Sequence, residues 1–497
     1  MKRSAGILVP LHALPNGITD LRLLIDWAAD HGLRWIQLLP INDGEDTSPY
    51  NTWSAFAANP RYLTLSEQEK PSRHDAAFER YCEKNQDWLG DYALFLSLRD
   101  HFRCGWQKFP KALRERQPEV LAKWEERLAD SIMFYSFIQW KFDEQWAACR
   151  EHANKKNVFL LGDLSFYLNT DSDAVWTHRE CFDLNGRTGV PPDFYSAGGQ
   201  FWEHYPYDWA AQKKSGYRLW KLRVNRMLDW FDGIRVDHFR ALYDYYWIPP
   251  QADKAKWRGK DLREAWKKKH WLENPLITGE TLPFPESAPV ESVIRMLDGR
   301  WCDGPRDNFI HEVFEPVLSK KSALIVAEDL GLLSSGVYEL RDRSGIPGMK
   351  PIIFGLDFSA EYWNTGSFPE NSVAVTTTHD CATLAGELGN LNTIRFQKLA
   401  EALRDEGFLK EPASVDTLRV ALLRKTCASP SMLAVIAYQD LFGLDNSHRT
   451  NRPNTVGPHN WTDRFPLSIQ DLKNNDGVLA QKTNALVDEL LAESNRR

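Results

Sequence analysis

The 497-residue chain contains no apolar run that approaches the ~20 residues a membrane-spanning helix needs, so a membrane is not an expected partner. It has no excess of positive charge either, because 61 Lys and Arg stand against 68 Asp and Glu, a formal net charge of −7. Proteins that bind nucleic acids carry a basic excess, which argues against a nucleic-acid partner. With 43% hydrophobic and 26% charged residues, the composition excludes a disordered chain or a fibre.

Several common chemical motifs are also missing. The seven cysteines are scattered and form no CxxC pair, so the sequence predicts neither a disulfide framework nor a zinc site. There is no HExxH or HxH pair, no GxSxG elbow and no phosphate-binding P-loop. We therefore expect no metal ion and no cofactor. Because Pro10 interrupts the first apolar run and no signal-peptide cleavage site follows, we expect a cytoplasmic location.

Aromatic residues are abundant, with 20 Trp, 16 Tyr and 25 Phe. Their rings carry a large apolar area, and Tyr and Trp add a polar group. Such a composition fits a large core, and it also fits a cleft on which flat substrates such as sugars stack.

Eight short apolar runs, each ending abruptly in polar or charged residues, recur along the chain. They are Ile7–Leu11, Trp35–Leu39, Phe159–Leu161, Gly233–Val236, Leu324–Ala327, Ile352–Phe358, Val373–Val375 and Met432–Ala437. Continuous runs of this kind are typical of strands buried on both faces. Helical patterns such as Ile18–His31, Tyr217–Phe231 and Asn392–Glu406 lie between them. The alternation predicts an α/β fold, a (β/α)8 TIM barrel with its site at the C-terminal ends of the strands.

A doubly wound sheet is the alternative fold, but no glycine-rich fingerprint follows the first strand. The uneven spacing of the runs predicts a single barrel over residues 1–497 with helical insertions over the C-terminal face of the strands. We expect a helical subdomain at 42–157 between strands 2 and 3, a substrate-loop region at 167–229, and an insertion at 250–322 between strands 4 and 5. The tail Val478–Ala492 has the pattern of an amphipathic helix, so no separate C-terminal domain is expected.

Acidic residues end three of the predicted strands. Strand alternation puts Arg235 and Asp237 on one face of the fourth strand. Glu328 ends the fifth strand and Asp380 follows the seventh. Taken alone, each carboxylate fits a structural ion pair, such as Arg235 with Asp237, because burying a carboxylate is costly unless it is paired. Three acidic strand ends at one mouth fit better the chemistry of glycosidic bonds, in which one carboxylate is the nucleophile and another moves the proton.

Three segments closely resemble the catalytic motifs of the amylomaltase family, the 4-α-glucanotransferases of glycoside hydrolase family 77, which are related to α-amylases. They are Arg235-Val-Asp-His-Phe-Arg240, Ala327-Glu-Asp-Leu-Gly331 and Thr376-Thr-Thr-His-Asp380. Shorter matches in family order extend the resemblance over residues 4 to about 465. They include Ser48-Pro-Tyr50, Gly162-Asp-Leu164, Gly189-Val-Pro-Pro-Asp193, Tyr207-Asp-Trp209 and Asn460-Trp461.

The resemblance implies that Asp237 is the nucleophile, Glu328 the general acid and base, and Asp380 a stabiliser of the transition state. It also implies substrate-binding roles for eight further residues, some in the donor pocket and some in a loop that closes over the glucan. These residues are Tyr50, Asp193, Phe194, Trp202, Arg235, His238, His379 and Asn451.

The activity implied is that of a 4-α-glucanotransferase. It would transfer a segment of an α-1,4-glucan, with retention and through a glycosyl-Asp intermediate, to the 4-hydroxyl of glucose or of another glucan. Maltooligosaccharides and α-1,4-glucans would be the substrates and glucose an acceptor. Two alternatives stay open, a mainly hydrolytic relative that uses the same residues and a non-catalytic glucan-binding protein.

The sequence departs from the family pattern near these motifs. Thr377 and Cys381 replace the usual Gly and Asn, and Ala241 replaces a usual Gly. The segments Trp202–Pro206 and Asp261–Asp298 are also unusual. None of the three carboxylates is lost. Because the changes fall in loops expected to shape the acceptor side, the choice of acceptor and the ratio of transfer to hydrolysis are where we expect this chain to differ.

Overall fold

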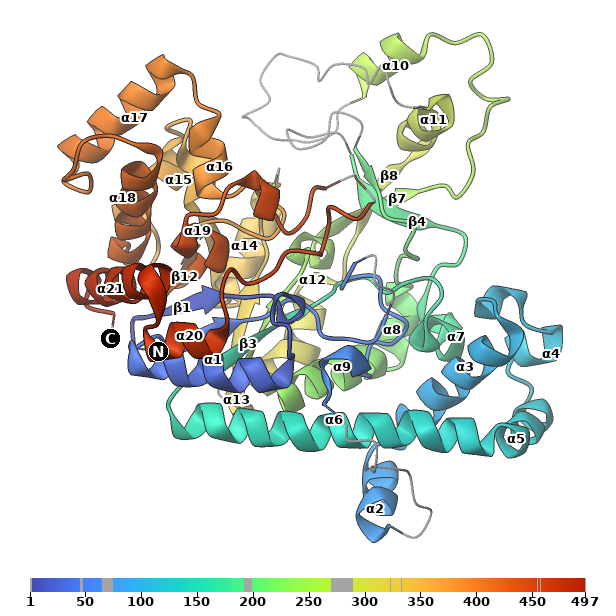
Figure 1. Cartoon of the computed structure of the whole chain (residues 1–497). Helices are drawn as coiled ribbons and strands as arrows, with labels where there is room; N and C mark the ends of the chain where they lie inside the picture. The colour runs from blue at the N-terminus through green and yellow to red at the C-terminus, as the bar shows by residue number, and fades with distance from the viewer. Residues whose placement is uncertain are drawn as a thin grey trace.

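The computed structural model describes residues 2–44, 48–64, 75–191, 199–269, 289–321, 323–331, 333–453, 455 and 457–496. Eight parallel strands close a barrel at the centre of the molecule (Figure 1). Their order around the barrel is β1 (Ser4–Leu8), β2 (Trp35–Gln37), β3 (Phe159–Leu164), β6 (Gly233–Val236), β9 (Leu324–Ala327), β10 (Gly348–Pro351), β11 (Ser372–Val375) and β12 (Leu433–Ala437), which pairs with β1. The predicted TIM barrel is confirmed.

Both faces of the barrel strands are buried. Inside the barrel lie apolar side chains that include Leu8, Trp35, Leu161, Val326, Met349, Val373, Val375, Leu433 and Val435. Their neighbours along the strands, such as Ile7, Ile36 and Ile234, belong to the larger core between the strands and the helices. Because successive side chains of a strand point to opposite faces, burial of both faces produces the continuous apolar runs seen in the sequence.

The prediction of the sixth strand was wrong. The strand is β10, and the apolar run 352–358 that follows it begins with the 3-10 helix Ile352–Gly355. β10 escapes the apolar pattern because it contains Lys350, whose Nζ donates to Glu361 Oε1 at 2.8 Å, and ends in a proline. Ile352 is fully buried without being in a strand, so its apolar character reports burial and not strand structure.

The predicted helices are present with boundaries one or two residues away. They are α1 (Ile18–Asp30), α9 (Arg218–Trp230), α17 (Thr393–Asp405) and α21 (Gly477–Ser494). The other helices after β3 are α7 (Asp173–Thr177), α8 (Trp209–Lys214), α10 (Leu262–Lys268), α11 (Val290–Asp298), α12 (Arg306–Phe309), α13 (Glu315–Lys321), α14 (Ser335–Arg343), α15 (Ala360–Trp363), α16 (Leu384–Gly389), α18 (Val415–Ala428), α19 (Tyr438–Phe442) and α20 (Ile469–Asn474). None of the helices in the described part of the chain combines the length and the apolar character that crossing a membrane needs.

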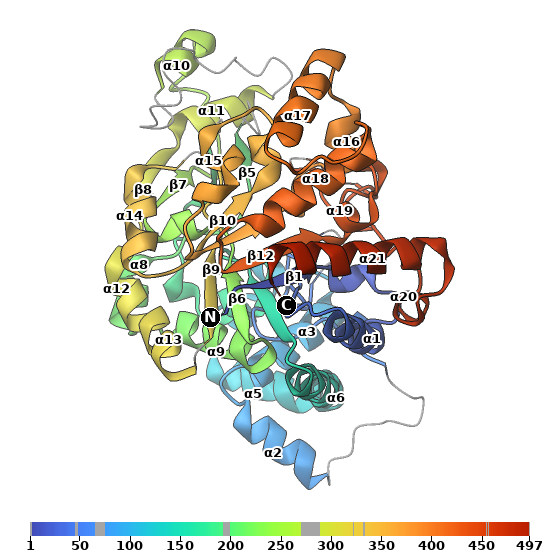
Figure 2. The same ribbon diagram turned by 90° about the vertical axis from the view of Figure 1, so that its left-hand side faces the viewer.

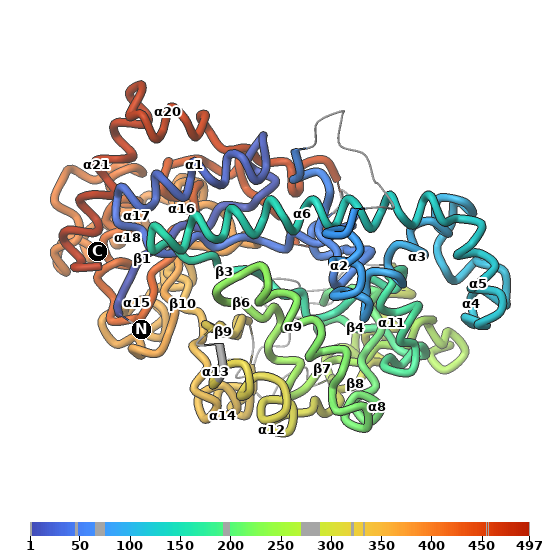
Figure 3. Tube along the Cα trace, turned by 90° about the horizontal axis from the view of Figure 1, so that it is seen from below, coloured from blue at the N-terminus to red at the C-terminus, as the bar shows by residue number. Residues whose placement is uncertain are grey.

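Among the described residues between β2 and β3, five segments are α-helices. They are α2 (Ala76–Lys84), α3 (Leu89–Phe102), α4 (Lys111–Arg114), α5 (Pro118–Arg127) and α6 (Ala129–Lys155). The last of them, α6, packs against β3 and runs alongside α1 on the outside of the barrel (Figure 3). Because α6 covers a barrel strand, we propose that the inserted subdomain expected at 42–157 ends before it, with α5.

A second sheet was not predicted. It has four antiparallel strands in the order β5 (Gln200–Phe201), β4 (Arg187–Val190), β7 (Asp244–Ile248) and β8 (Arg300–Asp303). The pattern of Ile- and Val-rich runs did not predict it, because β4, β5 and β8 lack continuous apolar runs and the run in β7, Tyr245–Ile248, is mostly aromatic. Two of the strands come from the segment between β3 and β6 and two from the segment between β6 and β9, so these two segments meet in one sheet. A small core that includes Tyr246, Trp266 and Val293 joins this sheet to α10 and α11.

The two ends of the chain lie close together (Figures 1 and 2), and α21 packs against α18. Arg496 is fully buried there, and its guanidinium donates to the main-chain oxygens of Ser4 at 2.7 Å and Cys427 at 2.6 Å. The last helix is therefore part of the barrel's outer layer.

Candidate active site

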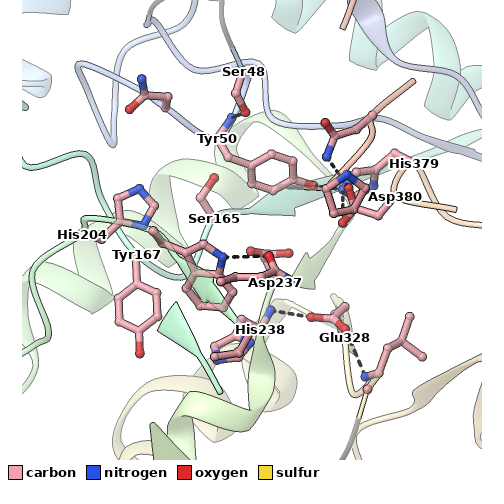
Figure 4. A pocket seen from close by; sticks show the side chains of 18 of the residues that line it. Ser48, Tyr50, Ser165, Tyr167, His204, Asp237, His238, Glu328, His379 and Asp380 are labelled. Carbon is pink, nitrogen blue, oxygen red and sulfur yellow. Dashed lines mark hydrogen bonds and ion pairs between the residues drawn. The ribbon is translucent and has the colours of Figure 1, made fainter. Parts of the chain in front are cut away.

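A cleft of about 930 Å³ lies at the C-terminal ends of the barrel strands. Nine of the eleven predicted site residues line it: Tyr50, Trp202, Arg235, Asp237, His238, Glu328, His379, Asp380 and Asn451. Figure 4 labels six of them, Tyr50, Asp237, His238, Glu328, His379 and Asp380. The other two, Asp193 and Phe194, lie outside the described residues. The acidic ends of three strands predicted from sequence thus meet at one cleft.

Arg235 on β6 lies between two carboxylates. Its Nη1 donates to Asp163 Oδ1 and Oδ2, at 2.7 and 2.8 Å, and to Asp237 Oδ1 at 3.0 Å. The strand register brings Asp163 of β3 directly beside Arg235. Asp163 is fully buried, whereas the side chain of Asp237 is 27% exposed. The predicted ion pair between Arg235 and Asp237 therefore exists, and it leaves Asp237 accessible from the cleft.

Asp163 was not among the predicted site residues, although its motif was noted. It ends an apolar strand with an acidic residue, which is the same signal that singled out Asp237. Tyr50 donates its hydroxyl to Asp163 Oδ2 at 2.7 Å. Asp163 therefore connects the arginine at the centre of the site to an aromatic ring of the cleft wall.

Glu328 is held at the end of β9 by two main-chain groups. Its Oε2 accepts from the N–H of His238 at 2.8 Å, and its Oε1 accepts from the N–H of Leu330 at 3.0 Å. His238 has a left-handed backbone conformation, with φ of 45°, which few residues other than glycine adopt. Because β6 and β9 are neighbours in the barrel, Glu328 and Asp237 face the same cleft from adjacent strand ends.

A third group surrounds Asp380 after β11. Asn451 Nδ2 donates to Asp380 Oδ1 at 2.6 Å, and the Asn451 N–H donates to the His379 carbonyl at 3.0 Å. His379 Nε2 lies 3.5 Å from Asp380 Oδ2 and 3.1 Å from the Tyr50 hydroxyl. The rings of Tyr50 and His379 stack, with centroids 5.3 Å apart. The ring centroids of Trp461 and Tyr50 lie 5.9 Å apart. Trp461 belongs to a motif noted in the sequence but was not among the predicted site residues.

Trp202 forms the wall beside His238. The two rings meet edge to face, with centroids 4.8 Å apart. Trp202 Nε1 donates to Gln200 Oε1 at 3.1 Å. The ring centroids of Tyr167 and Trp202 lie 6.1 Å apart. Tyr167 lines the cleft although no motif singled it out, because in the sequence it is one aromatic residue among many.

Burial sets the protonation of the site. It raises the pKa of Asp237; Arg235 opposes this rise, and nearby carboxylates, including Glu328, add to it. Burial also raises the pKa of Glu328, and Arg235 again opposes the rise. Burial lowers the pKa of His238 to about 3 and lowers that of His379, so both imidazoles are neutral near pH 7.

The unusual residues near the motifs have local explanations. Thr377 donates its hydroxyl to the buried Asp440 at 2.6 Å. Cys381 lies 3.2 Å from the hydroxyl of Thr378, and burial raises the pKa of its thiol to about 11. Ala241 is fully buried and is not part of the cleft lining, so it does not obstruct the cleft. Within the described ranges, no three His, Cys, Asp or Glu side chains gather in a way that could hold a metal ion.

Comparison with known proteins agrees with this geometry. The family model described as 4-alpha-glucanotransferase, glycoside hydrolase family 77, matches residues 16–70 and 65–469. A 4-alpha-glucanotransferase of Synechocystis sp. is 29% identical over 95% of each chain, and one of Streptococcus pneumoniae is 28% identical over 93% of each. The fold is similar to that of an amylomaltase from Streptococcus agalactiae in complex with acarbose, with a TM-score of 0.79, 24% identity and full coverage of both chains. The chain belongs to glycoside hydrolase family 77, the family of the 4-alpha-glucanotransferases.

Proposed function

We propose that this enzyme transfers a segment of an α-1,4-glucan to a second sugar through a covalent intermediate on Asp237. The observation that carries the proposal is the pairing of Arg235 with Asp237 in an open cleft, with Glu328 at the end of the adjacent strand. A nucleophile and a proton donor on neighbouring strand ends are the two groups that a retaining reaction requires.

The proposed mechanism needs the two carboxyl groups in different states before the reaction, and burial raises the pKa of both. Arg235 donates directly to Asp237, which favours the ionised form of that carboxyl. Burial raises the pKa of Glu328, which favours its protonated form. Each Glu328 oxygen accepts one main-chain N–H and keeps a second lone pair, so the carboxyl can carry a proton without losing its position.

In the first half of the reaction, an Asp237 oxygen attacks the anomeric carbon while the bond from that carbon to the glycosidic oxygen breaks. Glu328 gives its proton to the leaving oxygen, and the reducing-end part of the glucan departs. In the second half, the 4-hydroxyl of the acceptor loses its proton to Glu328 and attacks the same carbon, which frees Asp237. Two displacements at one carbon retain its configuration.

The remaining residues position the sugar and stabilise charge. Asn451 and His379 hold Asp380, whose carboxylate would stabilise the positive charge that develops on the sugar ring. Tyr50 presents its ring to the cleft, and its hydroxyl is anchored on Asp163. We also propose that Asp193 and Phe194 contact the glucan, that glucose serves as an acceptor and that the enzyme works in the cytoplasm. A mainly hydrolytic enzyme would use the same groups, so the outcome depends on whether a sugar or water reaches the intermediate.

Incubation with maltotriose, followed by measurement of free glucose, of the oligosaccharide ladder and of total reducing ends, tests the proposal. We expect products longer than maltotriose, released glucose and no rise in reducing ends. The variant Asp237→Asn is the control and should lose at least about a thousandfold in kcat, since a carboxylate nucleophile is replaced by a neutral amide. Shorter products alone with rising reducing ends would identify a hydrolase. Equal inertness of wild type and variant, with longer glucans as well, would favour the glucan-binding alternative.

A further inference from the structure

The imidazole of His204 lines the cleft and has no part in the steps above. His204 lies shortly after β5. Two main-chain hydrogen bonds with Thr188 of β4 fix the segment from Trp202 to His204 at its two ends. The N–H of Trp202 donates to the Thr188 carbonyl at 3.0 Å, and the N–H of Thr188 donates to the His204 carbonyl at 3.0 Å. Thr188 is fully buried. The second sheet therefore holds His204 in place without using its side chain.

The His204 ring belongs to an aromatic wall of the cleft. It stacks on Tyr167, with centroids 6.2 Å apart and an angle of 28° between the planes. The ring centroid of Tyr167 in turn lies 6.1 Å from the ring centroids of both Trp202 and His238. In Figure 4, His204 and Tyr167 lie together on the side of Asp237 that is away from His379. In this Tyr167–Trp202–His204 wall, Tyr167 comes from the segment after β3, and Trp202 and His204 come from the segment after β5.

The two ring nitrogens of His204 are in different surroundings. Nδ1 is enclosed, and no described residue forms a hydrogen bond with it. Nε2 is not enclosed and also has no partner among the described residues, and the ring lines the cleft. Burial lowers the pKa of His204 to about 4, so the ring is neutral and carries a single proton. Because a buried N–H without an acceptor is the rarer and costlier arrangement, we assign that proton to Nε2.

We propose that the Nε2–H of His204 donates a hydrogen bond to a hydroxyl of the glucan, on a glucose unit that packs against the Tyr167–Trp202–His204 wall. A neutral donor beside aromatic faces suits a sugar, whose ring stacks while its hydroxyl oxygens accept hydrogen bonds. A site that offers such a donor discriminates against ligands lacking the matching hydroxyl, because its polar group is then left unpaired. His204 would therefore be a specificity-determining residue, an inference that rests on the proposed function.

Three substitutions separate hydrogen bonding from packing. His204→Phe keeps a flat ring on Tyr167 but removes the donor, His204→Gln keeps an N–H donor without the aromatic ring, and His204→Ala removes both. Each is made in the Asp237→Asn background, so that the binding of maltotriose to maltoheptaose is measured by calorimetry without turnover. Melting curves confirm that each variant is folded. Wild-type enzyme is tested for the maltotriose ladder in parallel.

We expect the Phe and Ala variants to bind the glucans about three- to tenfold more weakly, the size of one neutral hydrogen bond, and the Gln variant to recover most of that loss. Equal binding by the Phe variant and its parent, with a loss confined to Ala and Gln, would show that His204 only packs and would overturn the proposal. Unchanged binding in all three would overturn it as well. A wild-type enzyme that binds glucans but makes no ladder contradicts the proposed function, whatever the His204 variants do.

Discussion

At the scale of single residues, Arg235 lies between two carboxylates that have different tasks. Asp163 is buried and accepts two of its hydrogen bonds, while Asp237 accepts one and faces the cleft. A buried arginine that served a single carboxylate would bind that carboxylate more tightly and lower the carboxylate's basicity. The charge of Asp163 also raises the pKa of Asp237. We therefore propose that Asp163 is a positioning residue that keeps Asp237 basic.

The variant Asp163→Asn tests this division of tasks. The charge of Asp163 raises the pKa of Asp237, so its removal should lower that pKa. In the proposed mechanism activity requires ionised Asp237, and therefore the acid limb of the profile of kcat/KM against pH should move to lower pH. We also expect kcat to fall about tenfold or more, because a less basic carboxylate is a weaker nucleophile.

Asp173→Asn is the matched control for that measurement. Asp173 is equally buried, accepts from the hydroxyl of Ser54 at 2.6 Å and does not line the cleft. Its removal should leave the acid limb in place. A limb that stays fixed in Asp163→Asn, or moves to higher pH, would contradict the role given to Asp163.

At the scale of elements, the second sheet builds one wall of the cleft. β4 and β5 pair so closely at Gly189 that a Cβ there would lie 2.1 Å from the Gln200 carbonyl oxygen. Gln200 in turn accepts the hydrogen bond of Trp202 Nε1. The glycine is therefore needed for close approach of two backbones, and its absence would displace the strand that carries Trp202.

Gly189 is not one of the catalytic groups, but Gly189→Ala should still lower activity because it displaces a wall of the cleft. We expect kcat/KM for maltotriose to fall about ten- to hundredfold, since displacements near 1 Å in a substrate wall have effects of that size. Gly366→Ala is the control, because a Cβ at Gly366 meets no atom within 4 Å. Equal activity of the two variants would show that the second sheet does not shape the site.

At the scale of the whole molecule, Arg496 links β1 to the segment that leads into β12, the two strands whose pairing closes the barrel. Arg496 donates to the carbonyls of Ser4, Cys427, Ser429 and Ser431 at 2.6–2.9 Å. Burial lowers its pKa to about 10. Removal of the side chain would leave several buried carbonyl groups without donors.

Arg496→Ala should therefore lower the free energy of unfolding by about 2–4 kcal/mol, the sum of a few lost hydrogen bonds to a charged group. Urea unfolding at pH 7 measures this loss. Because Arg496 does not line the cleft, activity on maltotriose at 25 °C should stay at the wild-type level. A loss below about 0.5 kcal/mol, the size of an ordinary surface substitution, would show that the chain end does not hold the barrel.

The parts of this architecture that sequence reasoning predicted are those with a local signal. Strands buried on both faces leave continuous apolar runs, and Asp237 and Glu328 end such runs. A local pattern did not predict β10, because Lys350 interrupts it, or the second sheet, which depends on pairing between segments far apart in the sequence such as β4 and β7. The lack of hydrogen-bond partners for the ring nitrogens of His204 among the described residues could not be predicted either, because only the folded chain shows which groups surround them.

The most direct test of the account is to trap the covalent intermediate. The variant Glu328→Gln is mixed with an α-maltotriosyl fluoride, whose leaving group needs no proton, and the protein is examined by mass spectrometry and peptide mapping. We expect a maltotriosyl adduct on Asp237 that persists in the presence of glucose, because the variant lacks the base that takes the proton of the acceptor hydroxyl. Release of a β-configured product without any adduct, or an adduct on another residue, would contradict the account.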